Sequence, residues 1–199
     1  MKKLIGFVVL ALLLFGSHKQ VLAGNIVGKV KAHGVKNSAD AVVYIDKIPS
    51  KQFTPPKKHP EFNQQNLMFH PHVLPVLVGT TVDFLNSDDV LHNVFSPDAC
   101  AGKFNLGTWP KGQIRTYTFT QPNCSAVILC NVHPEMEAYV VVVETPYFAV
   151  TDKEGNYEIK DVPAGKYTLK IWHEKLKGEP VSVEVPAKGD ATMNFDIKR

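Results

Sequence analysis

Apolar and polar residues alternate one by one in several short segments of this chain, and that rhythm belongs to β-strands. Apolar side chains at 167, 169 and 171 alternate with Thr168 and Lys170, and the segment 193–197 repeats the pattern. A strand of this kind has one apolar face and one polar, solvent-exposed face, as in antiparallel sandwiches. After Gly24 no segment has sustained helical periodicity. We therefore expect an all-β protein.

Two β modules are expected, because the pattern changes near residues 144–147. Before this break the strands are irregularly spaced, and residues 47–66, rich in Pro, Lys, Gln and Asn, indicate a connector. After it, turn signals recur about every ten residues. The continuous apolar run 126–130 is typical of a strand buried on both faces. Strands are expected at 26–30, 41–45, 73–78, 81–85, 116–120, 126–130, 138–143, 167–171 and 193–197.

The N-terminus has the pattern of a cleaved secretory signal peptide. Lys2 and Lys3 precede twelve apolar or small residues, 4–15, and Val21-Leu22-Ala23 offers small residues at the cleavage positions before Gly24. An uncleaved anchor is disfavoured, because a membrane-spanning helix needs about 20 residues. We expect residues 1–23 to be removed and the protein to be exported, periplasmic or secreted, in a bacterial cell. We do not expect an integral membrane protein.

The formal charge of +3 comes from this N-terminal segment. Residues 1–23 hold three basic residues and no acidic one, so the remaining chain has 19 basic against 19 acidic residues. A formally neutral chain lacks the basic excess typical of nucleic-acid binding. We therefore expect no nucleic-acid partner.

The segment 130–136 combines residue types that bind transition metals. Cys130, His133 and Met136 follow one another at three-residue intervals in a loop between two expected strands. A thiolate, an imidazole and a weak thioether suit copper, which needs one further imidazole from elsewhere. His92 can supply it, so we expect His92, Cys130 and His133 around one copper, with Met136 axial. Zinc is the competing metal, because Cys and two His can hold it with water, but a thioether argues against zinc.

In these segments the chain resembles the cupredoxins, the plastocyanin-like and amicyanin-like blue copper proteins. The matching stretches are 69–71, 76–82 with Asn86, 92–94 and 130–136. Two residues separate His133 from Met136, as in the short loop of amicyanin. The resemblance covers roughly residues 62–144 and implies a Greek-key β-sandwich or barrel with one type 1 copper. It also implies that Asn93 braces the two ligand loops near the Cys130 sulfur.

The C-terminal module resembles the carboxypeptidase-regulatory-like (transthyretin-like) domain, a small prealbumin-like antiparallel sandwich. The matching stretches are 151–157 and 162–169. The Gly-x-Val and Ala-x-Val-x-Val strands that open this family are absent from 145–199, but Gly28-Lys29-Val30 and Ala41–Ile45 look like them. Joined modules of these two kinds resemble bacterial methylamine utilisation proteins, a label that establishes no role here.

We therefore expect an interrupted arrangement. Residues 24–54 and 145–199 would form the sandwich, and the copper domain, 55–144, would be inserted between its second and third strands. The alternative is sequential, with 24–144 as the cupredoxin and 145–199 as a separate sandwich. Chain order alone does not decide between them.

Three cysteines in an exported chain leave one unpaired unless a metal takes it. With Cys130 on copper, Cys100 and Cys124 remain, and an oxidising compartment favours a disulfide between them. The alternative is two separate buried thiols. His70 and His72 could form a second, weaker metal site, although two imidazoles are an incomplete ligand set.

These residues favour a one-electron carrier between periplasmic redox proteins, which would dock near His133. An enzyme, such as a copper oxidase or nitrite reductase, is not expected. Such enzymes need a second copper wired through histidines beside the cysteine, and here Leu129 and Asn131 flank Cys130. A fully ligated type 1 copper also leaves no open position for substrate. The alternative is a copper-delivery or interaction module in which the sandwich binds a partner or carbohydrate.

Overall fold

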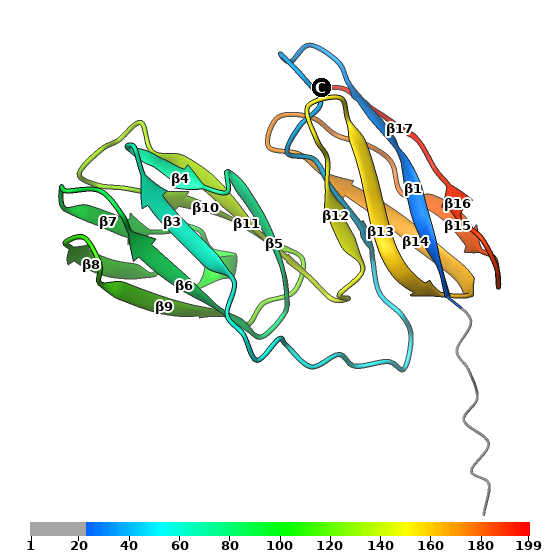
Figure 1. Cartoon of the computed structure of the whole chain (residues 1–199), viewed down its shortest axis with the longest axis horizontal. Helices are drawn as coiled ribbons and strands as arrows, with labels where there is room; N and C mark the ends of the chain where they lie inside the picture. The colour runs from blue at the N-terminus through cyan, green and yellow to red at the C-terminus, as the bar shows by residue number, and fades with distance from the viewer. Residues whose placement is uncertain (1–22) are drawn as a thin grey trace, which may run out of the picture.

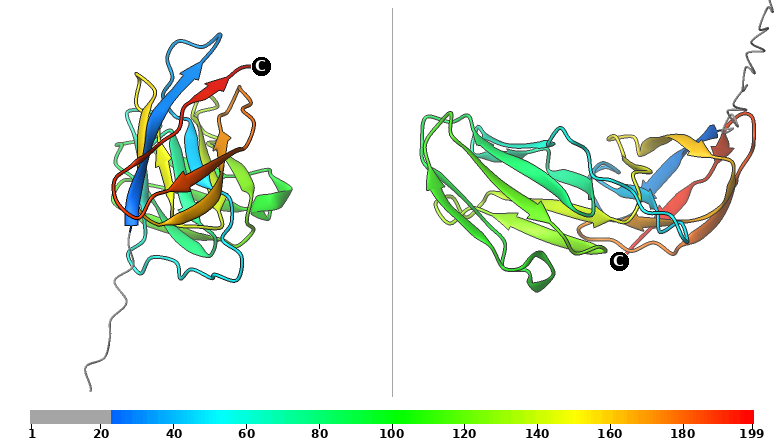
Figure 2. Two further views of the ribbon diagram at one scale, coloured as in Figure 1. Left: turned by 90° about the vertical axis from the view of Figure 1, so that its right-hand side faces the viewer. Right: turned by 90° about the horizontal axis from the view of Figure 1, so that it is seen from below.

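The computed structural model describes residues 23–199, and its regular structure is β throughout. Within this part of the chain the only helical element is a 3₁₀ turn, η1 (Ala99–Ala101), so the predicted all-β fold is confirmed. The expected signal peptide lies outside the described residues, apart from Ala23. None of the described helices is long and apolar enough to cross a membrane. The strands form two units that lie side by side along the molecule (Figures 1 and 2).

The central unit is a sandwich of two sheets that carries the loop 130–136. One sheet has the spatial order β5 (Val73–Leu77), β11 (Glu137–Val143), β10 (Cys124–Leu129), β7 (His92–Phe95) and β8 (Asn105–Trp109). The other has the order β4 (Met68–His70), β3 (Glu61–Gln65), β6 (Thr80–Asn86) and β9 (Ile114–Phe119). Strict alternation makes β6 a strand: Val82 and Phe84 are buried and their neighbours Thr81 and Asp83 are partly exposed.

The hairpin of β10 and β11 fixes where the loop 130–136 emerges. Its antiparallel register runs from Cys124 opposite Val142 to Leu129 opposite Glu137. The prediction that residues 126–130 are buried on both faces is wrong, because burial alternates along β10 and its exposed face is only partly covered. The apolar run is explained by one fully buried face and one partly covered face, rather than by a central strand between two layers.

The flanking unit is a second sandwich, built from both ends of the described chain. In one sheet β1 (Ala23–Ala32) pairs antiparallel with β13 (Asn156–Pro163) and parallel with β16 (Ala191–Thr192) and β17 (Phe195–Ile197). The other has the order β12 (Phe148–Val150), β2 (Val42–Ile45), β14 (Gly165–Trp172) and β15 (Val181–Val185). Ile26, Ile45, Ile159, Leu169 and Ile197 are among its buried core side chains.

β1 and β2 therefore precede the central unit in the chain and pair with strands that follow it (Figure 1). Gly28, in the Gly-x-Val motif, lies so close to the C-terminal segment that a Cβ there would be 1.7 Å from the carbonyl oxygen of Met193. This pairing favours the interrupted arrangement. The exact boundaries 24–54, 55–144 and 145–199 stay a prediction.

Two local predictions were wrong. The connector is shorter than 47–66, because Glu61–Gln65 forms β3, in which Phe62 and Gln64 are buried. Gln64 is a polar residue at a buried position, so apolar and polar residues do not alternate along this strand in the sequence. The strand expected at 193–197 is shorter and begins at Phe195, because Met193 and Asn194 interrupt the pairing between β16 and β17: the N–H of Met193 bonds to the carbonyl of Val27, and the side chain of Asn194 accepts the N–H of Lys29.

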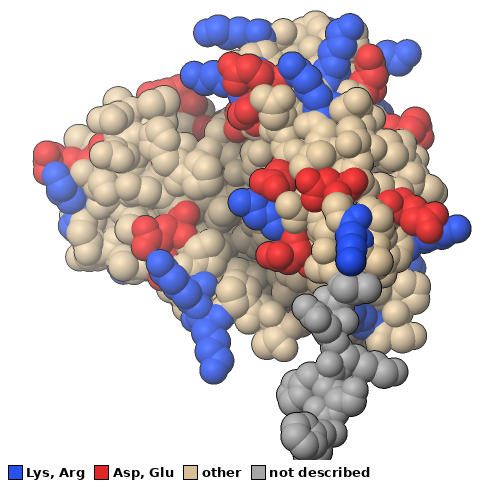
Figure 3. All heavy atoms as spheres, turned by 45° about the vertical axis from the view of Figure 1, so that its right-hand side comes forward, with Lys and Arg blue, Asp and Glu red and all other residues tan. Residues whose placement is uncertain are grey.

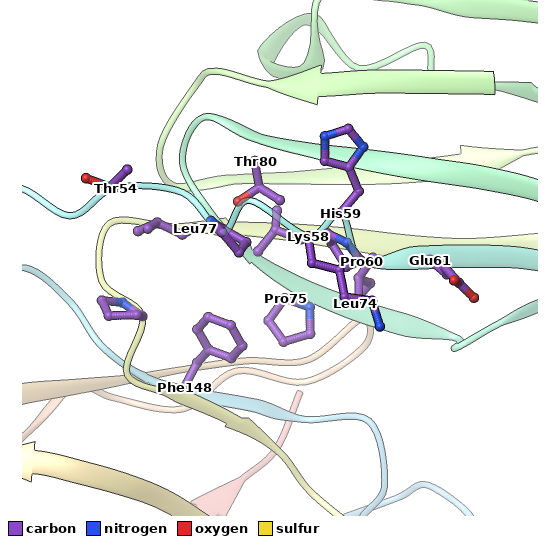
Figure 4. A pocket seen from close by; sticks show the side chains of 13 residues that line it. Thr54, Lys58, His59, Pro60, Glu61, Leu74, Pro75, Leu77, Thr80 and Phe148 are labelled. Atoms are coloured by element: carbon purple, nitrogen blue, oxygen red, sulfur yellow. The ribbon is translucent and has the colours of Figure 1, made fainter. Parts of the chain in front are cut away.

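The two units pack through a small apolar cluster. Val42 of β2, Val73 of β5 and Val141 and Val143 of β11 are buried together. A cavity of about 780 Å³ lies beside this junction, lined by residues within 54–61 of the connector and the start of β3, by residues 74–77 of β5, and by Thr80, Pro146 and Phe148 (Figure 4). None of the expected metal-binding residues lines it. On the face seen in Figure 3, acidic and basic side chains lie interspersed rather than in a patch of one sign.

Candidate metal centre

His92 is the first residue of β7, and its position is set by two neighbouring segments. Its backbone is opposite Trp109 of β8, and its side chain is fully buried. The ring Nε2 lies 2.8 Å from Oδ2 of Asp88 in the preceding loop. The other ring nitrogen, Nδ1, is left to face the loop 130–136.

Cys130 and His133 come from the loop that joins β10 to β11. Cys130 follows the last residue of β10 and is 3% exposed, whereas His133 is half-buried. The loop closes through a hydrogen bond from the N–H of Met136 to the carbonyl of His133, at 3.0 Å. A short loop held at both strand ends and closed internally has little freedom to move its side chains.

These segments bring three potential ligand atoms together. Nδ1 of His92 lies 3.1 Å from Nδ1 of His133 and 4.0 Å from Sγ of Cys130. The three ligand atoms all lie within 4.8 Å of one another. Met136 is 1% exposed and belongs to the same buried core as Cys130. The structure thus gathers His92, Cys130 and His133, while coordination by Met136 stays a prediction.

Asn93 connects the two ligand-bearing segments. Its N–H points at Sγ of Cys130 from 3.5 Å, and its Oδ1 accepts the N–H of Asn131 at 3.3 Å. Its Nδ2 donates to Oδ1 of Asn105 and to the carbonyl of Gly107, at 2.9 and 2.8 Å. One buried amide therefore joins β7, the start of β8 and the loop after Cys130, in the position that a bracing residue requires.

The donor set fits a soft or borderline metal cation. Since Nε2 of His92 faces a carboxylate, the hydrogen-bond network assigns the ring proton to Nε2 and a lone pair to Nδ1. A second Nδ1 and a sulfur face this lone pair in a buried place. A cation would satisfy all of these acceptors together, and a buried thiolate with two imidazoles is a donor set that copper and zinc share.

Asp88 is the part of the site that sequence reasoning missed. Besides His92, its carboxylate accepts the N–H groups of Asn66 and Leu67, at 2.7 and 3.0 Å. Burial raises the pKa of Asp88, but the N–H of Leu67, the His92 ring and the N–H of Asn66 outweigh it, and the pKa is lowered overall. The only signal in the sequence was an acidic residue four positions before a candidate ligand.

The predicted disulfide between Cys100 and Cys124 is present. It joins η1, in the segment after β7, to the first residue of β10. Asp98 adds a second tie, because its Oδ2 accepts the N–H of Val127 at 2.7 Å. The strands that carry His92 and Cys130 are thus cross-linked at the end away from the ligand loop.

The other histidines do not join this cluster. Among residues 23–199, His92, Cys130 and His133 are the one trio of His, Cys, Asp or Glu side chains placed to share a metal. His70 is exposed, and Nε2 of His72 lies 3.6 Å from a carboxylate oxygen of Glu174 in the flanking unit. A second metal site at His70 and His72 gains no support from these contacts.

Fold and site together define a two-unit all-β protein with a buried Cys/His candidate metal centre. Residues 133–198 match the family model of the carboxypeptidase regulatory-like domain. The match begins inside the ligand loop and leaves out β1 and β2, which complete the flanking sandwich. No curated protein matches the chain.

Cupredoxins are among the solved structures that are similar to this chain. A reduced amicyanin variant is 26% identical, with 44% of this chain and 84% of that chain covered and a TM-score of 0.41. A purple cupredoxin from Nitrosopumilus maritimus is 24% identical, with coverages of 42% and 98% and a TM-score of 0.38. The copper-containing nitrite reductase of Thermus scotoductus SA-01 is 26% identical, with coverages of 51% and 25% and a TM-score of 0.40. The comparisons return the same two families that the sequence motifs resemble.

Proposed function

We propose that this chain is an exported one-electron carrier that holds a single copper ion through His92, Cys130, His133 and Met136. The observation that carries the proposal is the convergence of two imidazole nitrogens and the sulfur of Cys130 within 4.8 Å in a largely buried site. A bound copper ion would supply a one-electron couple there. Met136, buried in the same core, favours copper over zinc, which rarely takes a thioether.

The surroundings of the site suit electron transfer because they resist rearrangement. Asn93 ties the two ligand segments together through two hydrogen bonds, at 3.3 and 3.5 Å, and is itself held to β8 by two more, at 2.8 and 2.9 Å. The Cys100–Cys124 disulfide ties the same strands farther from the loop. Ligands held in one geometry in both oxidation states lower the reorganisation that accompanies each transfer.

His133 is the ligand through which we expect electrons to enter and leave. It is the half-buried member of the trio, next to the exposed Val132, and the loop before His92 exposes Val90 and Leu91. Leu67 and Met68 are exposed too, and they line a hollow together with Glu135 and Met136. His70 and His72 line the same hollow. Exposed apolar side chains near the one partly exposed ligand imidazole would suit transient docking of a periplasmic redox protein.

We assign no catalytic reaction to this centre. Leu129 and Asn131 flank Cys130, so no histidine stands directly beside the cysteine to wire a second copper. Export through the signal peptide 1–23 belongs to the same proposal, since an oxidising compartment agrees with the Cys100–Cys124 disulfide.

Copper loading and voltammetry test the proposal. The mature protein, residues 24–199, is expected to bind one copper per chain and to cycle reversibly between Cu(I) and Cu(II). His92→Ala should abolish this reversible couple, whereas the matched change at an exposed histidine, His70→Ala, should leave it intact.

The delivery alternative predicts a different result. Copper that passes readily to a chelating acceptor, without a reversible couple, would support delivery and contradict the carrier. Tight binding of zinc with no stable copper complex would contradict both.

A further inference from the structure

We propose that Asp88 is a positioning residue that orients His92 and, through its negative charge, stabilises the oxidised form of the metal centre. This inference rests on the proposed copper function. It begins with the shortest polar contact of His92: Nε2 lies 2.8 Å from Oδ2 of Asp88. The His92 side chain is fully buried and that of Asp88 is 15% exposed, so this hydrogen bond is largely shielded from water.

The contact fixes which ring nitrogen can bind a metal. A carboxylate accepts a hydrogen bond and cannot donate one, so Nε2 of His92 carries the proton and donates it to Asp88. Nδ1 of His92 then presents a lone pair to His133 and Cys130. A carboxylate behind an imidazole ligand also makes the ring a stronger electron donor.

Asp88 is itself held in place from a distant part of the fold. The N–H groups of Asn66 and Leu67, in the turn between β3 and β4, both donate to its carboxylate. Both turn residues have positive φ, 55° and 57°, which aims two successive N–H groups at one point. The turn between β3 and β4 belongs to one sheet of the central unit, and His92 begins β7 in the other sheet. The Asp88 carboxylate thus links the two sheets at the metal site.

The segment between Asp88 and His92 is also closed internally. Oδ1 of Asn86 accepts the N–H of Asp88 at 2.9 Å, and Nδ2 of Asn86 donates to the carbonyls of Val90 and Trp109, each at 2.9 Å. Asn86 is 2% exposed. Because the loop is fixed on both sides of the carboxylate, Asp88 meets His92 in one arrangement.

A fixed negative charge next to the ligand should favour Cu(II) over Cu(I), since the oxidised ion carries one more positive charge. Asn at position 88 keeps one acceptor oxygen, enough for the N–H of Leu67 and Nε2 of His92, but it gives up the acceptor for Asn66 and removes the charge. Changes in such outer contacts cost about 10–100-fold in metal affinity. A tenfold loss confined to Cu(II) corresponds to about 59 mV for a one-electron couple.

The experiment compares Asp88→Asn with Asp89→Asn, a change at the neighbouring carboxylate, whose side chain is 89% exposed and pairs with Lys111. In the copper-loaded protein we expect Asp88→Asn to weaken Cu(II) binding about tenfold or more and to raise the reduction potential. Asp89→Asn should leave both unchanged. Equal potentials and affinities in the two variants would overturn the inference.

A second measurement needs neither copper nor a variant. In ¹⁵N-labelled, metal-free protein at neutral pH, the ring of His92 is expected to be protonated at Nε2 and unprotonated at Nδ1. A His92 ring protonated only at Nδ1 would overturn the role of Asp88 even if copper binds as proposed. If copper does not bind at all, the proposed function fails, and the metal-free measurement still decides whether Asp88 positions the ring.

Discussion

Nδ1 of His92 and Nδ1 of His133 lie 3.1 Å apart, although 41 positions separate the two residues in the chain. Each arrives by a different route: His92 at the start of β7, held by Asp88, and His133 in the loop between β10 and β11. Asn93, next to His92, hydrogen-bonds to the segment that carries His133. The site therefore depends on contacts between these two segments as much as on the ligand side chains themselves.

Replacing Asn93 with Ala should destabilise the metal-free protein and speed the release of copper from the loaded protein. Its side chain makes three hydrogen bonds in or near the core, and net values of about 0.5–1.5 kcal/mol each predict a loss of about 1.5–4.5 kcal/mol. Denaturant unfolding of the metal-free protein measures this loss, and the rate of copper release measures the second effect. Asn37→Ala, at an exposed turn, is the control; equal stability in the two variants would refute the bracing role.

Removing the disulfide should cost stability without removing the copper chromophore. The double variant Cys100→Ser/Cys124→Ser opens a loop with a sequence separation of 24 residues, for which chain entropy predicts about 3–4 kcal/mol. Chemical denaturation measures the stability, and the absorbance of the copper-loaded protein shows whether the copper site is intact. A double variant that folds but has lost its thiolate band would contradict this expectation and show that the copper site depends on the disulfide.

Gly28→Ala tests whether β1 belongs to the flanking sandwich. A Cβ at Gly28 would overlap the carbonyl of Met193, so we expect a loss of about 1–3 kcal/mol in that unit. Trp172 lies in β14 of the flanking unit and packs against Tyr139 of β11, so its fluorescence in a Trp109→Phe background follows the flanking unit together with its junction to the central unit. Lys29→Ala, an exposed neighbour, is the control. An unchanged Trp172 transition in Gly28→Ala would favour the sequential domain arrangement.

We expect the protein to lose stability in acid, in part because the Glu174 carboxylate becomes protonated. Burial raises its pKa, but Lys175, His72 and His173 outweigh this and lower it below the ordinary value of 4.5. Because the folded-state pKa is the lower one, this contribution is present above the unfolded pKa and is lost as pH falls through the folded pKa. Between about pH 5 and 3, Glu174→Gln should therefore lose less stability than the unmodified chain.

Thermal unfolding across that pH range measures the difference, with the exposed Glu179→Gln as the control. Identical acid profiles for Glu174→Gln and the unmodified chain would show that the carboxylate does not stabilise the fold.

Much of the fold could be predicted because strict alternation is visible wherever one face of a strand is apolar, as at Tyr167 to Ile171. β3 was missed because Gln64 occupies an inward position and prolines surround the strand. β8 was missed because Asn105, Gly107 and Thr108 are exposed and only Trp109 is buried. In both strands, pairing with neighbours decides the structure, and that information is not local.

The same distinction applies to the site. Cys130 and His133 share one short loop, so their spacing alone predicted that they meet, and the cysteine count pointed to the disulfide. Asp88 could not be predicted, because its position depends on two N–H groups of a turn between other strands. Contacts that depend on tertiary structure leave little trace in a single sequence.

The visible and EPR spectra of the copper-loaded mature protein test the central claim most directly. A site formed by His92, Cys130 and His133 predicts an intense thiolate-to-copper charge-transfer band that ascorbate bleaches reversibly. The band should be absent in Cys130→Ser. A colourless protein after treatment with Cu(II), or a band that survives in Cys130→Ser, would contradict the account.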